Sequence, residues 1–279
     1  EALIKAGYNL FSDMIIKIFG SATGGKINFT FKIVNFSQKP DNLDIDTVKN
    51  ILINKEKPSE INKKNNNKNK RKTRPYLEQI IKNNQLQTYL QPIFSIPENK
   101  KIGFEVLTRG PENSRYFKPA QLFEDANKYN LTQELELKCV INGLQWRKKI
   151  DDSLLITINI SLNLLKSEDF IQTITDPKYI NLLPNIAFEI TEHMPLEKVN
   201  EIKNRIKMLK TYGIQFALDD AGCGFFDIDA VKELKPEIVK LCITVINQLM
   251  NGKEIQKEIQ NTVNQIKKIN PNCTILAEG

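Results

Sequence analysis

The chain has 279 residues, of which 41% are apolar, and a formal net charge of +7. This length supports one large hydrophobic core, or a large domain beside a small one. No apolar run approaches the roughly 18 residues that a membrane-spanning helix needs, and the N-terminus lacks the pattern of a signal peptide. We therefore expect a soluble, cytoplasmic protein without a transmembrane segment.

The histidine and cysteine content limits the kinds of metal site. His193 is the single histidine, so imidazole-rich sites are excluded and a bound metal must be held by oxygen ligands. The four cysteines are far apart and show no CxxC spacing. This pattern favours buried free thiols in a reducing compartment over disulfides or zinc ligands.

The positive charge is concentrated in one segment. Residues 55–74 carry nine Lys and Arg against two Glu, which accounts for the whole excess of +7. An Asn/Lys-rich tract with few apolar residues cannot bury enough surface to fold, so we interpret residues 56–74 as a flexible linker. A weak attraction to RNA or acidic lipid is the alternative, but a basic linker gives no reason to expect specific nucleic-acid binding.

The predicted elements change character across this linker. Before it, residues 1–55 show a helical pattern at 3–19 and a strand-like run at 26–36, which we interpret as part of a larger module. After it, β-branched apolar runs occur at 87–96, 101–107, 154–161, 186–191, 214–219, 237–242 and 273–278. Amphipathic helical patterns separate most of them, at 119–129, 132–146, 196–210, 227–234 and 253–269. This alternation predicts an α/β fold, and so many repeats favour a TIM-like (β/α) barrel over an open sheet.

Polar residues end six of these apolar runs. In a parallel barrel the carboxyl ends of all strands meet on one face, where such barrels place their chemistry. Each carboxylate alone is as well explained by a helix cap or a surface ion pair. Together they bring five carboxylates, an amide and an ammonium to one mouth: Glu105, Asn159, Glu189, Asp219, Asp220, Lys240 and Glu278.

So many carboxylates close together raise one another's pKa unless cations neutralise them. Oxygen ligands without histidine suit Mg²⁺ or Mn²⁺, and the adjacent Asp219 and Asp220 can serve two ions about 3.5–4 Å apart. Such a centre clamps the attacking and departing oxygens of a phosphoryl group, and Lys240 can orient the attacking water. The chemistry predicted is hydrolysis of a phosphodiester or a phosphomonoester.

Six motifs in order make this chain resemble a known family. They are GFEVLTRG, ITINIS, FEITE, ALDDAGCG, LKPEIVKL and ILAEG. The region from about Arg74 to Gly279 is similar to the EAL-domain phosphodiesterases of bacteria, which open the second messenger cyclic di-GMP to the linear dinucleotide pGpG. The motif that names the family matches Glu105, Val106 and Leu107. The letters EAL at the start of the chain lack the strand context and are coincidental.

The resemblance implies a role for each residue at the barrel mouth. It makes Glu105, Asn159, Glu189 and Asp219 ligands of a first metal ion, with Asp219 and Asp220 holding a second. Lys240 would position the nucleophilic water, and Glu278 would orient water bound to the metal. Substrate contacts are implied for Gln91, Leu107 and Arg109, where a guanidinium fork suits two phosphate oxygens. Glu192 would anchor the loop that follows the paired aspartates.

Several positions depart from the family pattern without being metal ligands. They are Ala221, Cys223, Phe226, Asp227, Cys242 and His193. The first hypothesis is therefore a metal-dependent phosphodiesterase. The alternative is a catalytically inactive EAL domain that binds cyclic di-GMP as a receptor or signalling module.

The resemblance also predicts the organisation of the chain. We divide it into a partial N-terminal module at 1–55, a linker at 56–74 and an EAL barrel at 75–279 that is incomplete at its C-terminal end. The N-terminal module is interpreted as a degenerate diguanylate-cyclase-like domain or another sensory remnant. A homodimer formed through the barrel is expected from the resemblance alone.

Overall fold

The structure is a computed structural model that describes residues 27–30, 66–95, 98, 100–191, 196–221, 228–242 and 253–278. Over these ranges no helix combines the length and the apolar character that crossing a bilayer requires. The helix predicted at 3–19 lies outside the described residues, and the division of the chain into three regions stays a prediction.

The described strands close into a barrel in chain order. Their bounds are β1 Ile27–Thr30, β2 Gln87–Ser95, β3 Lys100–Arg109, β4 Leu155–Asn159, β5 Ile186–Thr191, β6 Gln215–Ala221, β7 Ile238–Leu241 and β8 Thr274–Glu278. From β3 to β8 each strand is parallel to the next, and β8 is parallel to β1. The TIM-like barrel predicted from the alternating pattern is confirmed.

One strand departs from a fully parallel barrel. Strand β2 is antiparallel to both β1 and β3. Only residues 96–99 connect β2 to β3, and a parallel pair needs a crossover of about a dozen residues or more. The two strands therefore form a long hairpin, whose register runs from Gln87 opposite Arg109 to Ser95 opposite Lys100.

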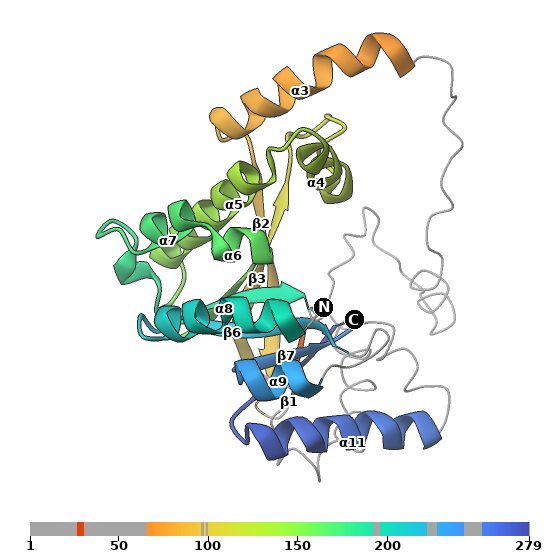
Figure 1. Cartoon of the computed structure of the whole chain (residues 1–279), viewed down its shortest axis with the longest axis vertical. Helices are drawn as coiled ribbons and strands as arrows, with labels where there is room; N and C mark the ends of the chain where they lie inside the picture. Colours follow the sequence, from red (N-terminus) through yellow and green to blue (C-terminus); the bar gives the residue numbers. More distant parts are fainter. Residues whose placement is uncertain are drawn as a thin grey trace, which may run out of the picture.

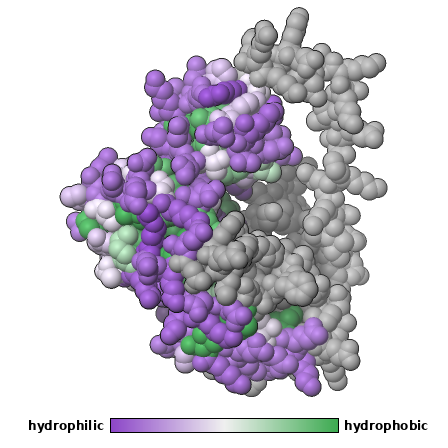
Figure 2. Space-filling model, viewed as in Figure 1, coloured by the Kyte–Doolittle hydropathy of each residue, from purple (hydrophilic) through white to green (hydrophobic). Residues whose placement is uncertain are grey.

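Helices flank the strands (Figure 1). The described helices are α3 Asn66–Lys82, α4 Pro119–Lys128, α5 Thr132–Trp146, α6 Leu162–Lys166, α7 Glu168–Ile174, α8 Leu196–Lys210, α9 Ile228–Leu234 and α11 Lys253–Ile269, with 3₁₀ turns η1 Arg147–Lys149 and η2 Ile180–Leu182. Helix α3 begins inside the segment predicted to be a linker. On the face drawn in Figure 2 the described surface is mostly hydrophilic, with hydrophobic residues in separate patches.

The barrel interior has an apolar layer directly beneath the polar mouth. This layer consists of Ile93, Ala187, Ala217, Ile238 and Leu276. Glu189, Asp219 and Lys240 each lie two positions beyond a member of the layer on the same strand, so they point to the same side of the sheet. Alternate side chains of each strand point into the barrel. The same alternation therefore places the apolar layer inside the barrel and directs the polar residues at the strand ends inward.

The main core lies between the barrel and its helices. Phe170 of α7, Phe188 of β5 and Phe216 of β6 pack edge to face, with ring centroids 5.6 and 6.2 Å apart. Such aromatic pairs add roughly 0.5–1.5 kcal/mol beyond the area they bury. They hold β5 and β6, the strands that carry Glu189 and Asp219, against the surrounding helices.

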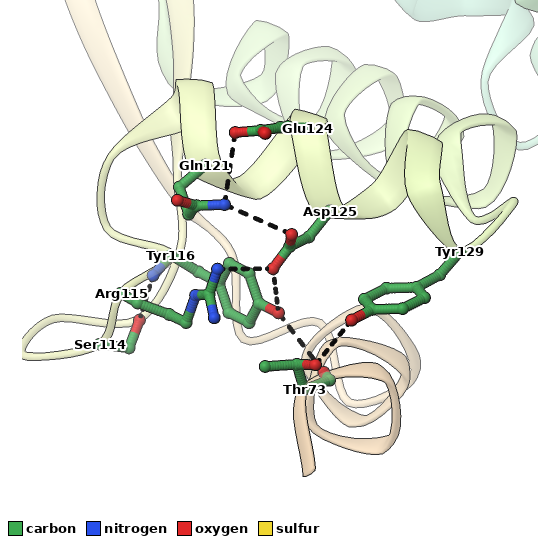
Figure 3. A network of polar contacts seen from close by, with 8 residues as sticks. All are labelled: Thr73, Ser114, Arg115, Tyr116, Gln121, Glu124, Asp125 and Tyr129. Atoms are coloured by element: carbon green, nitrogen blue, oxygen red, sulfur yellow. Dashed lines mark hydrogen bonds and ion pairs between the residues drawn. The ribbon is translucent and has the colours of Figure 1, made fainter. Parts of the chain in front are cut away.

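A second apolar cluster joins α3, α4 and α5, and a polar network borders it (Figure 3). The buried Tyr116 donates its hydroxyl to Asp125 Oδ2 at 3.0 Å, and Arg115 forms an ion pair with the same oxygen at 2.9 Å. Thr73 of α3 forms a hydrogen bond with Tyr129, the residue that follows α4, at 2.7 Å between the hydroxyl oxygens. These contacts fix the loop between β3 and α4 against helix α3.

Candidate functional site

Lys240 lies at the centre of the barrel mouth with its side chain fully buried. Its Nζ is 2.7 Å from Glu189 Oε2, 3.1 Å from Asp219 Oδ1 and 3.7 Å from Glu105 Oε2. The three carboxylates come from β5, β6 and β3, so barrel closure brings together residues that are far apart in the chain. A buried ammonium is tolerated here because three carboxylates surround it.

Asn159 completes the group from the end of β4. Its Nδ2 donates to Glu105 Oε1 at 3.3 Å. The strand register places Asn159 beside Glu189, and Thr191 beside Asp219. Because the amide donates through its nitrogen, its side-chain oxygen is the atom suited to a cation.

Glu189 is a fully buried carboxylate whose surroundings act on its pKa in opposite directions. Burial raises the pKa of its carboxyl group, and nearby Asp219 raises it further, while Lys240 acts in the opposite direction. Among the described residues, Glu189 Oε1 and Thr157 Oγ1 are both buried and make no hydrogen bond of ordinary geometry, although Thr157 lies close enough to lower the pKa of Glu189. An unpartnered buried carboxylate oxygen is costly unless another ligand satisfies it.

The donor atoms of this site suit a divalent cation. Ionised Glu105, Glu189 and Asp219 leave a net charge of −2 once Lys240 is counted. Hard cations prefer such carboxylate and amide oxygens, and the partnerless oxygen of Glu189 offers a ready ligand. Among the described residues, no three His, Cys, Asp or Glu side chains are already gathered in metal-binding geometry. The carboxylates instead contact Lys240.

The predicted substrate-contact residues lie on the β2–β3 hairpin. Gln91 is paired with Glu105, and Leu107 and Arg109 follow Glu105 at alternate positions of β3. Alternate residues of a strand point to the same side, so Leu107 and Arg109 continue the face that carries Glu105. Arg109 is half-buried, and its Nη1 donates to the Thr108 carbonyl at 2.9 Å.

Comparison with known families matches residues 75–279 to the EAL domain. The chain belongs to the EAL domain family. The predicted resemblance is thereby confirmed over almost the same residues. The family identity agrees with the geometry, because the residues of the EAL motifs are those gathered around Lys240.

Curated relatives of this EAL domain include two named cyclic di-GMP phosphodiesterases. PdeA of Borreliella burgdorferi is 33% identical over 219 residues, which cover 76% of this chain and 32% of PdeA. PdeB of Shewanella oneidensis is 31% identical over 194 residues, which cover 66% of this chain and 22% of PdeB. The chain thus spans a third or less of either relative.

Solved EAL structures share the fold. An EAL domain protein of Listeria monocytogenes EGD-e aligns with a TM-score of 0.62 and 23% identity, covering 73% of this chain and 81% of that chain. YkuI of Bacillus subtilis, solved in complex with substrate c-di-GMP and calcium, aligns with a TM-score of 0.54 and 23% identity, covering 72% of this chain and 55% of that chain.

The remaining predicted residues of the EAL site differ in how far the structure describes them. Asp220 lies near the end of β6, and Glu278 ends β8. The pairing of β6 with β7 shifts register between Leu218 and Ala221, around the paired aspartates. Such a bulge relaxes the strict alternation that would send adjacent residues to opposite faces. Glu192 lies outside the described residues.

The cysteine prediction is confirmed in part. Cys139 and Cys273 are free and buried. Cys242, two residues after Lys240, is disulfide-bonded, so the prediction of a free thiol is wrong there. The sequence could not indicate this bond, because a disulfide depends on the distance between two cysteines in space and can join residues that are far apart in the chain.

Sequence reasoning missed two aromatic residues beside Arg109. Tyr89 is paired with Leu107, and the Arg109 guanidinium lies over the Tyr89 ring at 5.8 Å. Phe117, in the loop after β3, packs against Tyr89 with ring centroids 6.3 Å apart. The signal available in the sequence was the alternation of β2, which places Tyr89 on the same face as Gln91.

Proposed function

We propose that this protein hydrolyses cyclic di-GMP to linear pGpG with two bound Mg²⁺ or Mn²⁺ ions. The observation that carries the proposal is the fully buried Lys240 among three carboxylates at the mouth of an EAL barrel. Two relatives of at least 31% identity are named cyclic di-GMP phosphodiesterases, which supports the same substrate class.

The residues at the mouth divide into two groups of metal ligands in this proposal. Glu105, Asn159, Glu189 and Asp219 would hold the first ion, and Asp219 with Asp220 the second. Bound divalent cations would polarise the phosphoryl oxygens and make water a better nucleophile. The partnerless Oε1 of Glu189 and the charge of −2 support this assignment.

Lys240 would orient the attacking water and offset the negative charge that develops on the phosphoryl group, and Glu278 would help to orient the water. The water oxygen forms a bond to phosphorus as the bond from phosphorus to the 3′ oxygen breaks. The proton lost by the water ends on that 3′ oxygen. The product keeps its 5′ phosphate, as linear pGpG requires.

The hairpin residues would hold the substrate during this displacement. Arg109 can donate two hydrogen bonds to phosphate oxygens, a geometry that lysine does not offer. Gln91 and Leu107, on the face that carries Glu105, would shape the site next to the reacting phosphate. Glu192 would anchor the loop after the paired aspartates.

The test is an assay of the full-length protein with cyclic di-GMP and Mg²⁺ or Mn²⁺, with products separated by chromatography. The wild type should form pGpG, whereas Glu105→Gln, which removes one charge and little volume, should form none. Glu112→Gln in the exposed loop after β3 is the matched control and should keep full activity. Turnover that survives Glu105→Gln would contradict the proposed ligand set.

The receptor alternative is supported by a departure close to the site. Cys242 occupies the position two residues after Lys240 where the family resemblance leads us to expect an aspartate, and it is buried and disulfide-bonded. Tight binding of cyclic di-GMP without turnover in either metal would favour the receptor. Absence of both binding and turnover would reject both functions.

Homodimerisation through the barrel and a cytoplasmic location belong to the same proposal. Sedimentation of the purified full-length protein, with and without cyclic di-GMP, would test the dimer. A monomer under both conditions would contradict it. Cell fractionation with antibody detection would test the location.

A further inference from the structure

Two exposed aromatic side chains, Tyr89 and Phe117, lie beside the predicted phosphate-binding arginine. Among the described residues, three large hydrophobic side chains are exposed: Tyr76, Tyr89 and Phe117, at 38%, 41% and 37%. Tyr89 and Phe117 contact each other edge to face, with an interplanar angle of 83°. An exposed pair of aromatic rings beside a cation is the kind of surface that binds a flat apolar group.

The strand register connects this pair to the catalytic cluster. Tyr89 lies two residues from Gln91 on β2 and is paired with Leu107, which lies two residues from Glu105 on β3. All four residues therefore share one face of the hairpin. At about 3.4 Å per residue, the Tyr89–Leu107 pair lies roughly 7 Å from Glu105 along the strands.

Arg109 lies at the next position on this face. Its guanidinium is 5.8 Å from the centre of the Tyr89 ring, near the outer limit of about 6 Å for a cation–π contact. The Tyr89 hydroxyl donates to Gln87 Oε1 at 3.1 Å, which holds the ring in place. A ligand that takes the space over the ring can displace the guanidinium from the Tyr89 face and from the Thr108 carbonyl toward a phosphate.

The loop that carries Phe117 is anchored on both sides. The Gly110 amide donates to the Tyr116 carbonyl at 2.9 Å, and the Phe117 amide donates to the Ser114 carbonyl at 3.1 Å. Tyr116 is itself buried and bonded to Asp125 (Figure 3). Phe117 is thus presented by a fixed loop, and a preorganised surface loses little conformational entropy on binding.

We propose that Tyr89 and Phe117 form a platform for one nucleobase of the substrate, in which the Tyr89 ring stacks on the base and the nearly perpendicular Phe117 ring contacts the edge of the base, while Arg109 binds the phosphate. This inference rests on the proposed function and extends it to how the base is held. Stacking on aromatic rings tolerates any base, since every base has a π face. The platform therefore contributes affinity for a purine dinucleotide, and the identity of the base must be read by other groups.

The experiment compares variants of the full-length protein in the cyclic di-GMP assay. Tyr89→Leu and Phe117→Leu keep apolar bulk but lose the aromatic face, and each should raise KM roughly tenfold with kcat nearly unchanged. Tyr89→Phe keeps the ring but loses the hydroxyl contact to Gln87, so its KM should lie much closer to that of the wild type than the KM of Tyr89→Leu. Tyr212→Leu removes a partly buried ring from the turn between α8 and β6, at the end of the barrel opposite the mouth, and is the control, with no effect on KM expected.

A binding measurement separates this inference from the proposed function. Calorimetric titration with cyclic di-GMP in Ca²⁺ should show the same loss of affinity for Tyr89→Leu and Phe117→Leu. A Tyr89→Trp variant should lose indole fluorescence when cyclic di-GMP binds, which a purely structural role would not produce. A wild type that binds or hydrolyses, with both leucine variants unchanged, would overturn the platform and leave the function standing. A wild type that does neither would overturn both.

Discussion

At the scale of single residues, Lys240 is the side chain on which the site depends most. Its ammonium contacts three carboxylates from three strands in a fully buried position. Removing one partner from a buried charge group leaves the others uncompensated, which typically costs about 3–5 kcal/mol. Lys240 is therefore as important for the stability of the barrel mouth as for its chemistry.

Lys240→Met should lower the free energy of unfolding by about 3–5 kcal/mol and abolish turnover, because the neutral side chain leaves Glu189, Asp219 and Glu105 unbalanced. Urea denaturation and the chromatographic assay measure the two effects. Lys232→Met, which breaks an exposed ion pair with Asp229, is the control and should cost under about 1 kcal/mol. Equal losses in the two variants would contradict the account of Lys240.

The two free cysteines give a second residue-scale prediction. Burial raises the pKa of the Cys139 thiol and of the Cys273 thiol to about 12. Only the thiolate reacts with iodoacetamide, so at pH 8 both should stay unmodified in the folded protein and react after unfolding in urea. Mass spectrometry of the digested protein would measure how much of each cysteine is modified. Rapid modification of either thiol in the folded protein would show that the structure around that thiol opens readily.

At the scale of elements, the loop from Gly110 to Lys118 links β3 to α4 and positions the end of the hairpin. A Cβ atom on Gly110 would lie 2.4 Å from the Tyr116 carbonyl oxygen, so this position requires glycine for close approach of the two backbone segments. The loop is further tied to α4 through Tyr116 and Asp125.

Gly110→Ala should force the loop away from β3 and cost about 1–3 kcal/mol of unfolding free energy. It should also raise KM for cyclic di-GMP, because Arg109 and Phe117 flank the distorted segment. Steady-state kinetics and urea denaturation measure both changes. Glu112→Ala, an exposed substitution in the same loop, should change neither. A normal KM for Gly110→Ala would show that the loop position does not influence the substrate.

Tyr116 gives the loop a dependence on pH. Burial and the hydrogen bond to Asp125 raise the pKa of the Tyr116 hydroxyl above its ordinary value of about 10. The folded protein therefore keeps this proton while the unfolded chain loses it as the pH rises past about 10, so the contribution of Tyr116 to stability is complete below that pH and declines above it.

Comparison of the wild type with Tyr116→Phe should isolate this effect. At pH 8 the variant should be less stable by about 1–2 kcal/mol, since Asp125 loses a buried donor. At pH 10.5 to 11 the difference should shrink. In the wild type alone, the unfolded chain is stabilised by losing the Tyr116 proton, which the folded protein retains. Urea denaturation at the two pH values measures the difference, and a constant difference would contradict the assignment.

At the scale of the whole molecule, barrel closure gathers the excess negative charge that a divalent cation would neutralise. A ligand that binds the folded state alone stabilises it by about 2.7 kcal/mol at a hundred times its dissociation constant. Millimolar Mg²⁺ or Mn²⁺ should therefore raise the melting temperature of the wild type. Glu189→Gln should remove most of this shift, whereas Glu78→Gln, at a partly exposed position on α3 where Glu78 pairs with Arg74, should retain it. An equal shift in all three proteins would place the cation elsewhere.

Sequence and structure agree best where the pattern is local. The seven apolar runs after the predicted linker end within a residue or two of strands β2 to β8, because alternation of β-branched residues depends only on neighbours in the chain. The direction of β2 was not predicted, since it depends on a connection too short for a crossover. Tyr89 and Phe117 were missed because their pairing joins a strand to a loop 28 positions later.

The sequence by itself determined which strands end in carboxylates, the amide and the lysine, and the motif order that assigns the chain to the EAL family, because both are properties of residue order. Only the tertiary structure decided that Lys240 Nζ lies within 3.7 Å of three carboxylates and that Glu189 keeps one oxygen without a partner among the described residues. Those distances depend on the register and closure of strands that are far apart in the chain, and no local pattern encodes them.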